Sequence, residues 1–330
     1  MRPPAFWHRP PDQPGGLARL LAPLGALYAN GTARRVARPG YTAKIPVICI
    51  GNLNAGGTGK TPTTIAIAER LAQRGHTSVH IVSRGYGGRL AGPDRVDPNK
   101  HTAADVGDEP LLLSAFAPTW IARDRAAGVR AAEAAGATAI LLDDGFQNPS
   151  VTKSLSIIVV DAAIGFGNGR CLPAGPLREP VAVGLARAEL LLSIGAASDQ
   201  TRFAALWGAQ IALPHLTAYL AALKTGMDWP GLRVLAFAGI GYPEKFFATL
   251  RGEGAILAAT VALEDHQPLS ASLMQRLTAQ AKSLGAQLVT TEKDAIRLPD
   301  RYRSDVLTLP VRLQVQDWTA LDAAFARLGL

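Results

Sequence analysis

The chain has 330 residues, of which 48% are hydrophobic and 18% are charged, and its formal net charge is +8. This length and composition predict a folded protein of one large domain or two ordinary ones, because enough apolar surface is available for a core. Two cysteines, Cys49 and Cys171, are too few for a disulfide framework, so the sequence does not require an oxidising compartment.

A basic segment covers residues 1–44. Its run LARLLAPLGALYA (17–29) is apolar but short, since a helix that crosses a bilayer needs roughly 20 apolar residues. The composition favours an amphipathic helix that docks on an anionic membrane surface over a transmembrane helix or a signal peptide. An ordinary helix packed on the domain is the alternative. Seven basic residues against Asp12 give +6, and they are Arg2, Arg9, Arg19, Arg34, Arg35, Arg38 and Lys44.

Apolar runs alternate with helix-like segments across residues 45–208. The runs are continuous, as expected for strands covered on both faces of a parallel sheet. The helix predicted at 62–74 places Ile65, Ala68 and Leu71 on one face. The pattern predicts an α/β fold with a mostly parallel sheet. The predicted strands are 45–50, 78–83, 138–144, 155–162 and 188–194.

A second set of elements follows a strand-rich linker that we place at 209–230. It predicts a smaller C-terminal α/β domain at 231–330. The predicted strands are 233–241, 286–291 and 306–311, and the predicted helices are 243–250, 269–285 and 318–330.

The stretch GNLNAGGTGKTPTT (51–64) lies between the first predicted strand and the first predicted helix of the core. Its glycines let the backbone turn tightly and aim N–H groups at an anion, and the following helix adds its positive end. Lys60 can reach the β and γ phosphates of a nucleotide, and the hydroxyl of Thr61 can bind Mg²⁺. Asn54 stands where the usual pattern has a glycine, and the neighbouring glycines are expected to supply the flexibility. The predicted nucleotide-binding residues are Asn54, Ala55, Gly56, Gly57, Thr58, Gly59, Lys60 and Thr61.

Further ligands for the metal are predicted in AILLDDGFQ, where Asp143 and Asp144 follow an apolar strand. Ligands of open α/β sheets bind at this carboxyl edge, so either acid can hold Mg²⁺, directly or through water. A guanine-reading motif is not matched, because Lys293 and Asp294 are adjacent in TEKD. The sequence therefore favours ATP over GTP.

Four more polar segments are each weak alone: SRGYGGR (83–89), VGDEP (106–110), PAGPLREP (173–180) and LEDHQPLS (263–270). Together with the phosphate loop and LLDDGFQ, in this order, they resemble the tetraacyldisaccharide 4′-kinase family of lipid A biosynthesis. The resemblance implies transfer of the γ-phosphate of ATP to the 4′-hydroxyl of a tetraacylated glucosamine disaccharide 1-phosphate, which yields ADP and a product of the lipid IVA type. It also implies a P-loop kinase core and work at the cytoplasmic face of the inner membrane of Gram-negative bacteria.

The resemblance assigns roles to single residues. Asp108 matches the family's base for the sugar hydroxyl, and His266 matches its histidine partner; Lys60 completes the predicted catalytic set. Asp143 and Asp144 match metal-side acids.

Other matches are less defined. Arg178 and Glu179 match a pair for which phosphate or metal contact is implied, and Arg84 is expected at a phosphate or in a structural ion pair. Lys293 and Asp294 are expected near the nucleotide or in domain closure. The sequence departs from the family where Gln267 follows His266 and where Gly88 precedes Arg89, which leaves Arg89 without a role.

Three alternatives remain at this stage. A P-loop enzyme for a small soluble substrate fits the apolar N-terminal run less well. A membrane-bound ATPase switch usually has a second lysine early in the loop, whereas Lys60 is the loop's lysine here. A nucleic-acid protein is disfavoured, because 27 basic residues face 25 acids after residue 44. The predicted partners are thus the lipid disaccharide and an anionic membrane, with no nucleic acid and no obligate protein partner.

Overall fold

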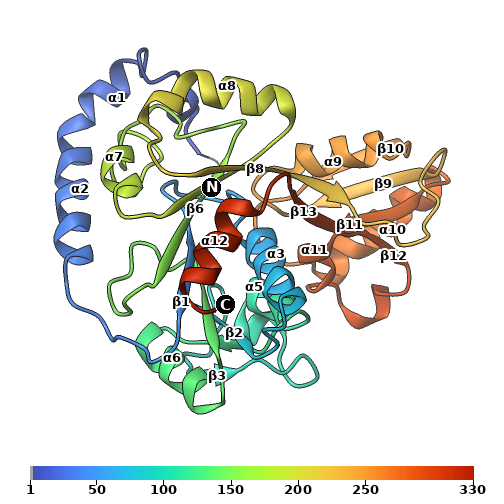
Figure 1. Cartoon of the computed structure of the whole chain (residues 1–330). Helices are drawn as coiled ribbons and strands as arrows, with labels where there is room; N and C mark the ends of the chain where they lie inside the picture. Colours follow the sequence, from blue (N-terminus) through green and yellow to red (C-terminus); the bar gives the residue numbers. More distant parts are fainter. Residues whose placement is uncertain (1–2) are drawn as a thin grey trace.

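The structure is a computed structural model, and it describes residues 3–330. Met1 and Arg2, which belong to the basic N-terminal segment, lie outside the described residues. Two sheets of unequal size organise the chain, and the smaller one lies at the right of Figure 1.

Within residues 3–330 the larger sheet has nine strands, and the pairs at its two ends are antiparallel while the rest are parallel. The five strands predicted for the core are present as β1, β2, β5, β6 and β7, and all their residues are buried. This burial confirms the prediction, made from the continuous apolar runs, that the sheet is covered on both faces. In spatial order the strands are β13 (Val311–Val315), β8 (His215–Ala222), β7 (Leu190–Ile194), β6 (Leu155–Asp161), β1 (Val47–Gly51), β5 (Ala139–Asp143), β2 (Val79–Ser83), β4 (Thr119–Ile121) and β3 (Asp94–Arg95).

Helices cover both faces of this sheet and build two separate apolar clusters. Leu71 and Phe325 belong to the cluster on one face, and Val129, Leu185 and Phe203 belong to the cluster on the other. The helices of the first face are α3 (Lys60–Gln73) and α12 (Thr319–Arg327), and those of the second are α6 (Arg125–Ala134), α7 (Val181–Leu185) and α8 (Ala197–Trp207). Two short helices, α4 (Ala103–Val106) and α5 (Asp108–Leu113), precede β4.

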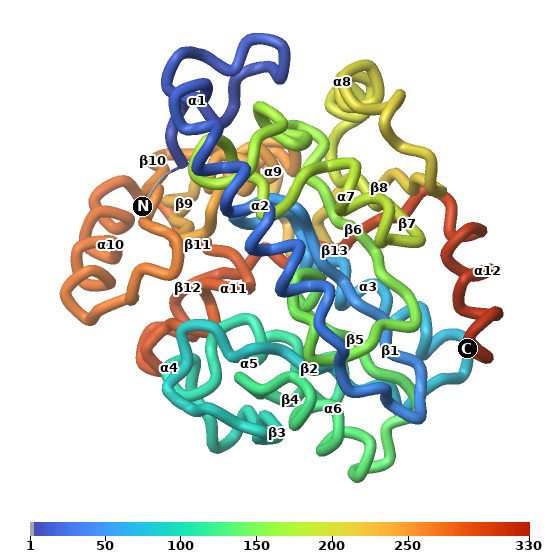
Figure 2. The backbone as a smooth tube through the Cα atoms, turned by 90° about the vertical axis from the view of Figure 1, so that its left-hand side faces the viewer, coloured from blue at the N-terminus to red at the C-terminus, as the bar shows by residue number. Residues whose placement is uncertain are grey.

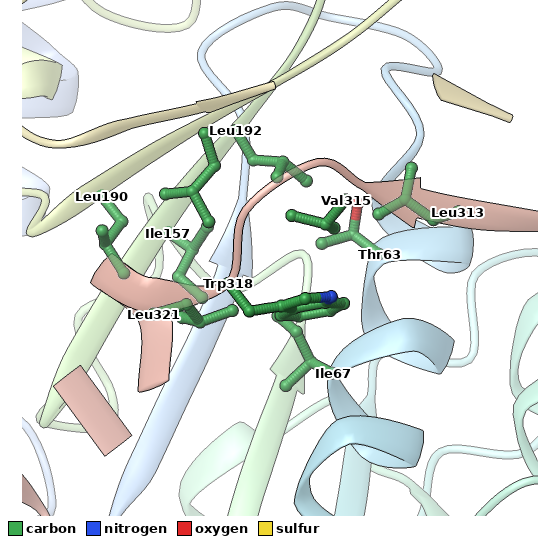
Figure 3. Close-up of a pocket in the computed structure, with 10 residues that line it drawn as sticks. Thr63, Ile67, Ile157, Leu190, Leu192, Leu313, Val315, Trp318 and Leu321 are labelled. Atoms are coloured by element: carbon green, nitrogen blue, oxygen red, sulfur yellow. The ribbon is translucent and has the colours of Figure 1, made fainter. Parts of the chain in front are cut away.

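A small apolar cavity of about 10 Å³ lies between the first face, α3 and the start of α12, with the Trp318 ring beside Ile67 (Figure 3). Apart from the Thr63 hydroxyl its lining is aliphatic or aromatic, and that hydroxyl donates to the carbonyl oxygen of Gly59. The cavity is therefore a packing feature of the core and offers no polar group to a substrate.

The smaller sheet is parallel throughout and carries a helix on each face. Leu235 and Phe237 of β9 face α10, while Val234 and Ala236 face α9, which is the alternation expected of a strand. Its strands, in spatial order, are β10 (Ile256–Ala262), β9 (Arg233–Ala238), β11 (Gln287–Thr291) and β12 (Val306–Leu309), and its helices are α9 (Pro243–Gly252), α10 (Ala271–Ser283) and α11 (Glu292–Ala295).

The chain crosses between the sheets twice, and these crossings differ from the predicted boundaries. The segment predicted as a linker, 209–230, contains β8, which pairs with β7 in the larger sheet. The run predicted as one strand, 306–311, is divided by Pro310, which has no N–H to donate to a ladder. Beyond it, β13 pairs with β8, so the last twenty residues of the predicted small domain return to the larger sheet.

The N-terminal apolar run forms two helices rather than one. α1 (Gly16–Leu20) ends at Leu21, and α2 (Ala22–Val36) starts there with Pro23 in its first turn, the position where a helix tolerates proline. Figure 2 shows α2 running along one side of the molecule. Within the described residues no helix is long and apolar enough to span a membrane.

Candidate active site

The phosphate loop connects β1 to α3 at the centre of the larger sheet. Gly59, just before α3, has φ 95°, and a Cβ there would lie 2.5 Å from Cδ1 of Ile194, so the backbone requires glycine. The side chain of Asn52 braces the loop from inside, because its Nδ2 donates to the Gly56 carbonyl at 3.2 Å and to Oγ1 of Thr58 at 3.0 Å.

Asn54, which replaces the usual glycine, anchors the loop. Its side chain is 6% exposed and donates to the carbonyl oxygen of Gly165 at 3.0 Å. The N–H of Ala55 donates to the Pro176 carbonyl at 2.7 Å. The loop is thus tied to the segment that precedes Arg178, and Gly56 and Gly57 remain exposed with open space around their Cα atoms.

Asp144 forms ion pairs with two basic side chains beside the loop. Its Oδ1 lies 3.9 Å from Nζ of Lys60 and 2.9 Å from Nη1 of Arg178, which brings three predicted site residues together. Burial raises the pKa of Asp144, but Lys60 and Arg178 outweigh it and hold the pKa below the usual value. Asp144 adopts φ 53°, a left-handed conformation that is uncommon for residues other than glycine, and such strain clusters at functional sites.

Asp143 is the more buried of the two acids, with 2% of its surface exposed. Burial raises its pKa to about 7, and the charges of Glu109 and Asp144 add to the effect. Ser83 donates to its Oδ2 at 3.1 Å, and Arg125 donates to its backbone oxygen at 3.2 Å. A buried carboxylate with an incompletely compensated charge is suited to a cation.

Glu179 is buried beside the base of the phosphate loop. Both of its oxygens lie 2.6 Å from Nη2 of Arg187, and its Oε1 accepts from Nε2 of Gln147 at 2.9 Å. Gln147 also donates to the Asn52 carbonyl at 2.8 Å. This chain of contacts supports the base of the phosphate loop.

Asp108 and His266 meet across the two sheets. Asp108 begins α5, beside the larger sheet, whereas His266 lies in the loop that follows β10 of the smaller one. Nδ1 of His266 lies 3.0 Å from Oδ2 of Asp108, and the N–H of Glu109 donates to Oδ1 at 3.0 Å. The predicted pair is therefore brought into contact by the fold, although the two residues are far apart in sequence.

Asp108 is only 4% exposed, yet its surroundings favour the carboxylate. Burial raises the pKa of Asp108. The hydrogen bond from His266 and the charges of Lys293 and Arg297 lower it by more, so the net pKa is below the usual value. Nε of Arg297 lies 3.8 Å from Oδ2. Arg297 in turn bonds the backbone oxygens of Gly239 and Gln267, which fixes its guanidinium in place.

Lys293 and Asp294 have separate roles despite being adjacent. Nζ of Lys293 lies 3.1 Å from Oε1 of Glu109. Asp294 is fully buried, and its carboxylate accepts from the N–H of Gly239 and from the hydroxyl of Thr291. Lys293 thus lies at the site, while Asp294 supports the loops around it.

The RGYGG loop approaches the turn that carries Asp108. A Cβ on Gly88 would lie 2.6 Å from the Asp105 carbonyl oxygen, which explains why glycine stands there. Arg84 is exposed, so its side chain remains open to an anion from solution. The rings of Tyr86 and His266 pack edge to face, with 5.9 Å between their centroids.

Several contributors were not predicted, although most lie inside the motifs that were. Ser83, Asn52, Gln147 and Glu109 each lie in a segment singled out in the sequence, and their hydrogen bonds become visible only in three dimensions. Arg125 begins α6 and Arg297 lies in the turn after α11, and neither has a local signature in the sequence. Among residues 3–330 no group of three or more His, Cys, Asp or Glu side chains is arranged to hold a metal.

A glycine-rich loop before a helix, a lysine at that helix's first residue and acids at the end of a neighbouring parallel strand define a P-loop nucleotide-binding protein. The model of the tetraacyldisaccharide-1-P 4′-kinase family matches residues 17–328. The chain belongs to this family, and it is a kinase that transfers phosphate to a hydroxyl group in lipid A biosynthesis.

Relatives cover the whole length of the chain. A tetraacyldisaccharide 4′-kinase of Dinoroseobacter shibae is 67% identical over 99% of this chain and 98% of the relative. One from a Jannaschia species is 61% identical over 98% of each. LpxK from Aquifex aeolicus, solved in complex with ATP, superposes with a TM-score of 0.77 over 95% of this chain and 99% of its own, at 24% identity, which bears on the fold alone.

Proposed function

We propose that the phosphate loop holds ATP and that Asp108 and His266 present the 4′-hydroxyl of the tetraacylated disaccharide 1-phosphate to its γ-phosphate. Family membership supports the reaction. The contact between His266 and Asp108 supports the residue assignment most directly, because it connects the smaller sheet to the edge that carries the loop. ATP is further supported by the A. aeolicus neighbour, whose title names it as the bound nucleotide.

The nucleotide side of the site is built from the N-terminal end of α3. Backbone N–H groups of residues 54–61 and the positive end of the helix would bind the phosphates. Lys60 would neutralise charge that develops on the transferring group, and Arg178 would assist from the other side of Asp144. Phosphoryl transfer needs mainly positioning and charge compensation, and this arrangement supplies both.

Thr61, Asp143 and Asp144 form a donor set that fits Mg²⁺. Magnesium usually takes one or two carboxylates and completes its shell with water and substrate phosphates, so few protein ligands are required. The raised pKa of Asp143, about 7, is consistent with a carboxylate that awaits a cation. Mg²⁺ held there would supply positive charge that stabilises the negative charge of the phosphates. Glu179, which faces Arg187 and Gln147, would contribute by holding the loop in place.

Asp108 would act as the general base. Its carboxylate accepts the proton of the 4′-hydroxyl while the hydroxyl oxygen attacks the γ-phosphorus and the bond to ADP breaks. The hydrogen bond from His266 holds the carboxylate in position. Arg84, exposed beside Tyr86, is suited to a phosphate of the lipid substrate.

The N-terminal helices would bring the enzyme to its substrate. One side of α1 and α2 exposes apolar side chains, with Leu20 at 76% and Leu27 at 67%, while Gly25 packs against the Cys171 carbonyl. Arg34, Arg35 and Arg38 are exposed at the end of α2, as an anionic surface requires. Docking would occur at the cytoplasmic face of the inner membrane, where ATP is available.

Two measurements test the proposal. A variant that lacks residues 1–38 should lose sedimentation with anionic vesicles, and full sedimentation of that variant would refute the docking role. ATP turnover by the full chain in detergent micelles should require the acceptor lipid. Turnover that is equally fast without acceptor would instead favour a membrane-bound ATPase switch.

A further inference from the structure

Lys293, on α11 beside the smaller sheet, contacts both His266 and Glu109, the residue that follows Asp108. Its Nζ lies 3.1 Å from Oε1 of Glu109 and 3.4 Å from Nε2 of His266. Oδ1 of Asp265 is 4.0 Å away. The side chain is 20% exposed, so these contacts are shielded from bulk water.

The donors and acceptors around His266 determine where its proton lies. The carboxylate of Asp108 only accepts hydrogen bonds, so Nδ1 of His266 must carry the hydrogen. The ammonium of Lys293 only donates, so Nε2 must be bare to accept from it. Both contacts are satisfied together only by a neutral imidazole with its proton on Nδ1.

We infer that Lys293 is a positioning residue that holds His266 as the neutral Nδ1–H tautomer and disfavours the imidazolium. This inference rests on the proposed function of Asp108 as base. An imidazolium next to Asp108 would make its carboxylate a weaker base, because the positive charge stabilises the anion. Lys293 opposes that state by placing a like charge at the other nitrogen of the ring.

The charges that face His266 from each neighbouring element are consistent with this role. They are Asp108 and Glu109 from α5, Asp265 from its own loop, Lys293 from α11 and Arg297 just beyond it, with the ring of Tyr86 on one side. The hydrogen bond to Asp108, with the charges of Asp108 and Asp265, raises the pKa of His266 above its usual value, and burial and the charge of Lys293 limit that rise. Burial lowers the pKa of Lys293, but Glu109 and Asp108 raise it more, so the ammonium remains charged.

The test compares three variants of the full chain: Lys293→Met, Lys293→Arg and Lys245→Met. Lys245 is the matched control, because it also joins the smaller sheet to the larger one, through Asp161 at 2.5 Å, from a different helix. The readouts are the pH profile of kcat and the NMR titration of the His266 imidazole, identified by comparison with His266→Gln.

In Lys293→Met the acid limb of kcat and the His266 titration should both move up by about one pH unit. Above that limb, both the variant and the wild type should show the Nδ1–H tautomer, because the carboxylate of Asp108 still accepts from Nδ1. Lys293→Arg, which keeps the charge, should retain the wild-type limb, and Lys245→Met should not move it.

An unshifted His266 titration in Lys293→Met would overturn the inference and leave Lys293 as a contact between sheets. A limb that moves equally in Lys245→Met would overturn it as well. If the wild type transferred no phosphate, the proposed function would fail, and the NMR titration would still decide the role of Lys293.

Discussion

Replacing Asp108 with asparagine should abolish most of the turnover and leave ATP binding intact. The change keeps the shape of the side chain and removes the proton acceptor. A positioned general base contributes about 10²- to 10⁴-fold, which corresponds to about 3–5 kcal/mol of transition-state stabilisation. The hydrogen bonds of Asp108 go to Glu109 and His266 and not to the phosphate loop, so the KM for ATP should change little.

The structural cost of this variant can be worked out separately. Each carboxylate oxygen of Asp108 accepts one N–H, from Glu109 and from His266. Asparagine has a single oxygen, so one of these buried donors loses its acceptor at a cost of about 1–3 kcal/mol in stability. That cost lowers the melting temperature without preventing folding.

A matched control is Asp105→Asn. Asp105 lies three residues before Asp108 and is 8% exposed. Its carboxylate accepts hydrogen bonds from the backbone N–H and the hydroxyl of Thr102. It should lower stability by a similar amount and keep kcat near wild type. The assay is steady-state transfer with both substrates varied, together with thermal unfolding. A kcat within about tenfold of wild type for Asp108→Asn, at a normal unfolding temperature, would refute the assignment of Asp108 as base.

Three further predictions follow from the same geometry. Lys60→Ala should raise the KM for ATP and lower kcat by about 10²-fold or more, because the phosphates lose a positive charge in both the bound substrate and the transition state. Nucleotide titration and initial rates check this, and unchanged values would exclude Lys60 from the site. Because the pKa of Asp143 is raised to about 7, a proton competes with Mg²⁺ near and below that pH, so the calorimetric affinity for Mg²⁺ should fall about fivefold from pH 7 to pH 6; a flat affinity would argue against Asp143 as a ligand. Asp322→Asn should cost about 1 kcal/mol in urea unfolding, because Arg70 and Arg74 hold α12 on α3 through this carboxylate. The hydrogen bond from Arg70 lowers the pKa of Asp322, so this contribution is present above the usual aspartate pKa and is lost as the pH falls through the lowered one; a stability difference that persists in acid would contradict it.

The sequence predicted those parts of the molecule whose signals are local. The phosphate loop and the buried strands beside it could be placed because glycine spacing and continuous apolar runs are determined within a few residues. β8 was missed as a member of the larger sheet because buried and exposed residues mix along it, and such a strand carries a weaker pattern than a continuous apolar run.

The division at Pro310 illustrates another limit of the sequence. β12 and β13 are consecutive in the chain, yet they belong to different sheets, and only tertiary pairing separates them. The same holds for Glu179, whose partner Arg187 could not be identified before the fold placed the two side chains together.

The site shows the same distinction. Asp108 and His266 were paired through the family resemblance, since nothing in their spacing brings together residues that lie in different halves of the chain. The roles of Arg297 and Lys293 depend on interatomic distances that no local pattern encodes.

The measurement that tests the account most directly is transfer of labelled γ-phosphate from ATP to a tetraacylated glucosamine disaccharide 1-phosphate in detergent micelles. The account predicts a labelled bis-phosphorylated lipid from the wild type and almost none from Asp108→Asn. Release of labelled free phosphate without any labelled lipid would contradict it, and it would leave the contact between Asp108 and His266 without a catalytic role.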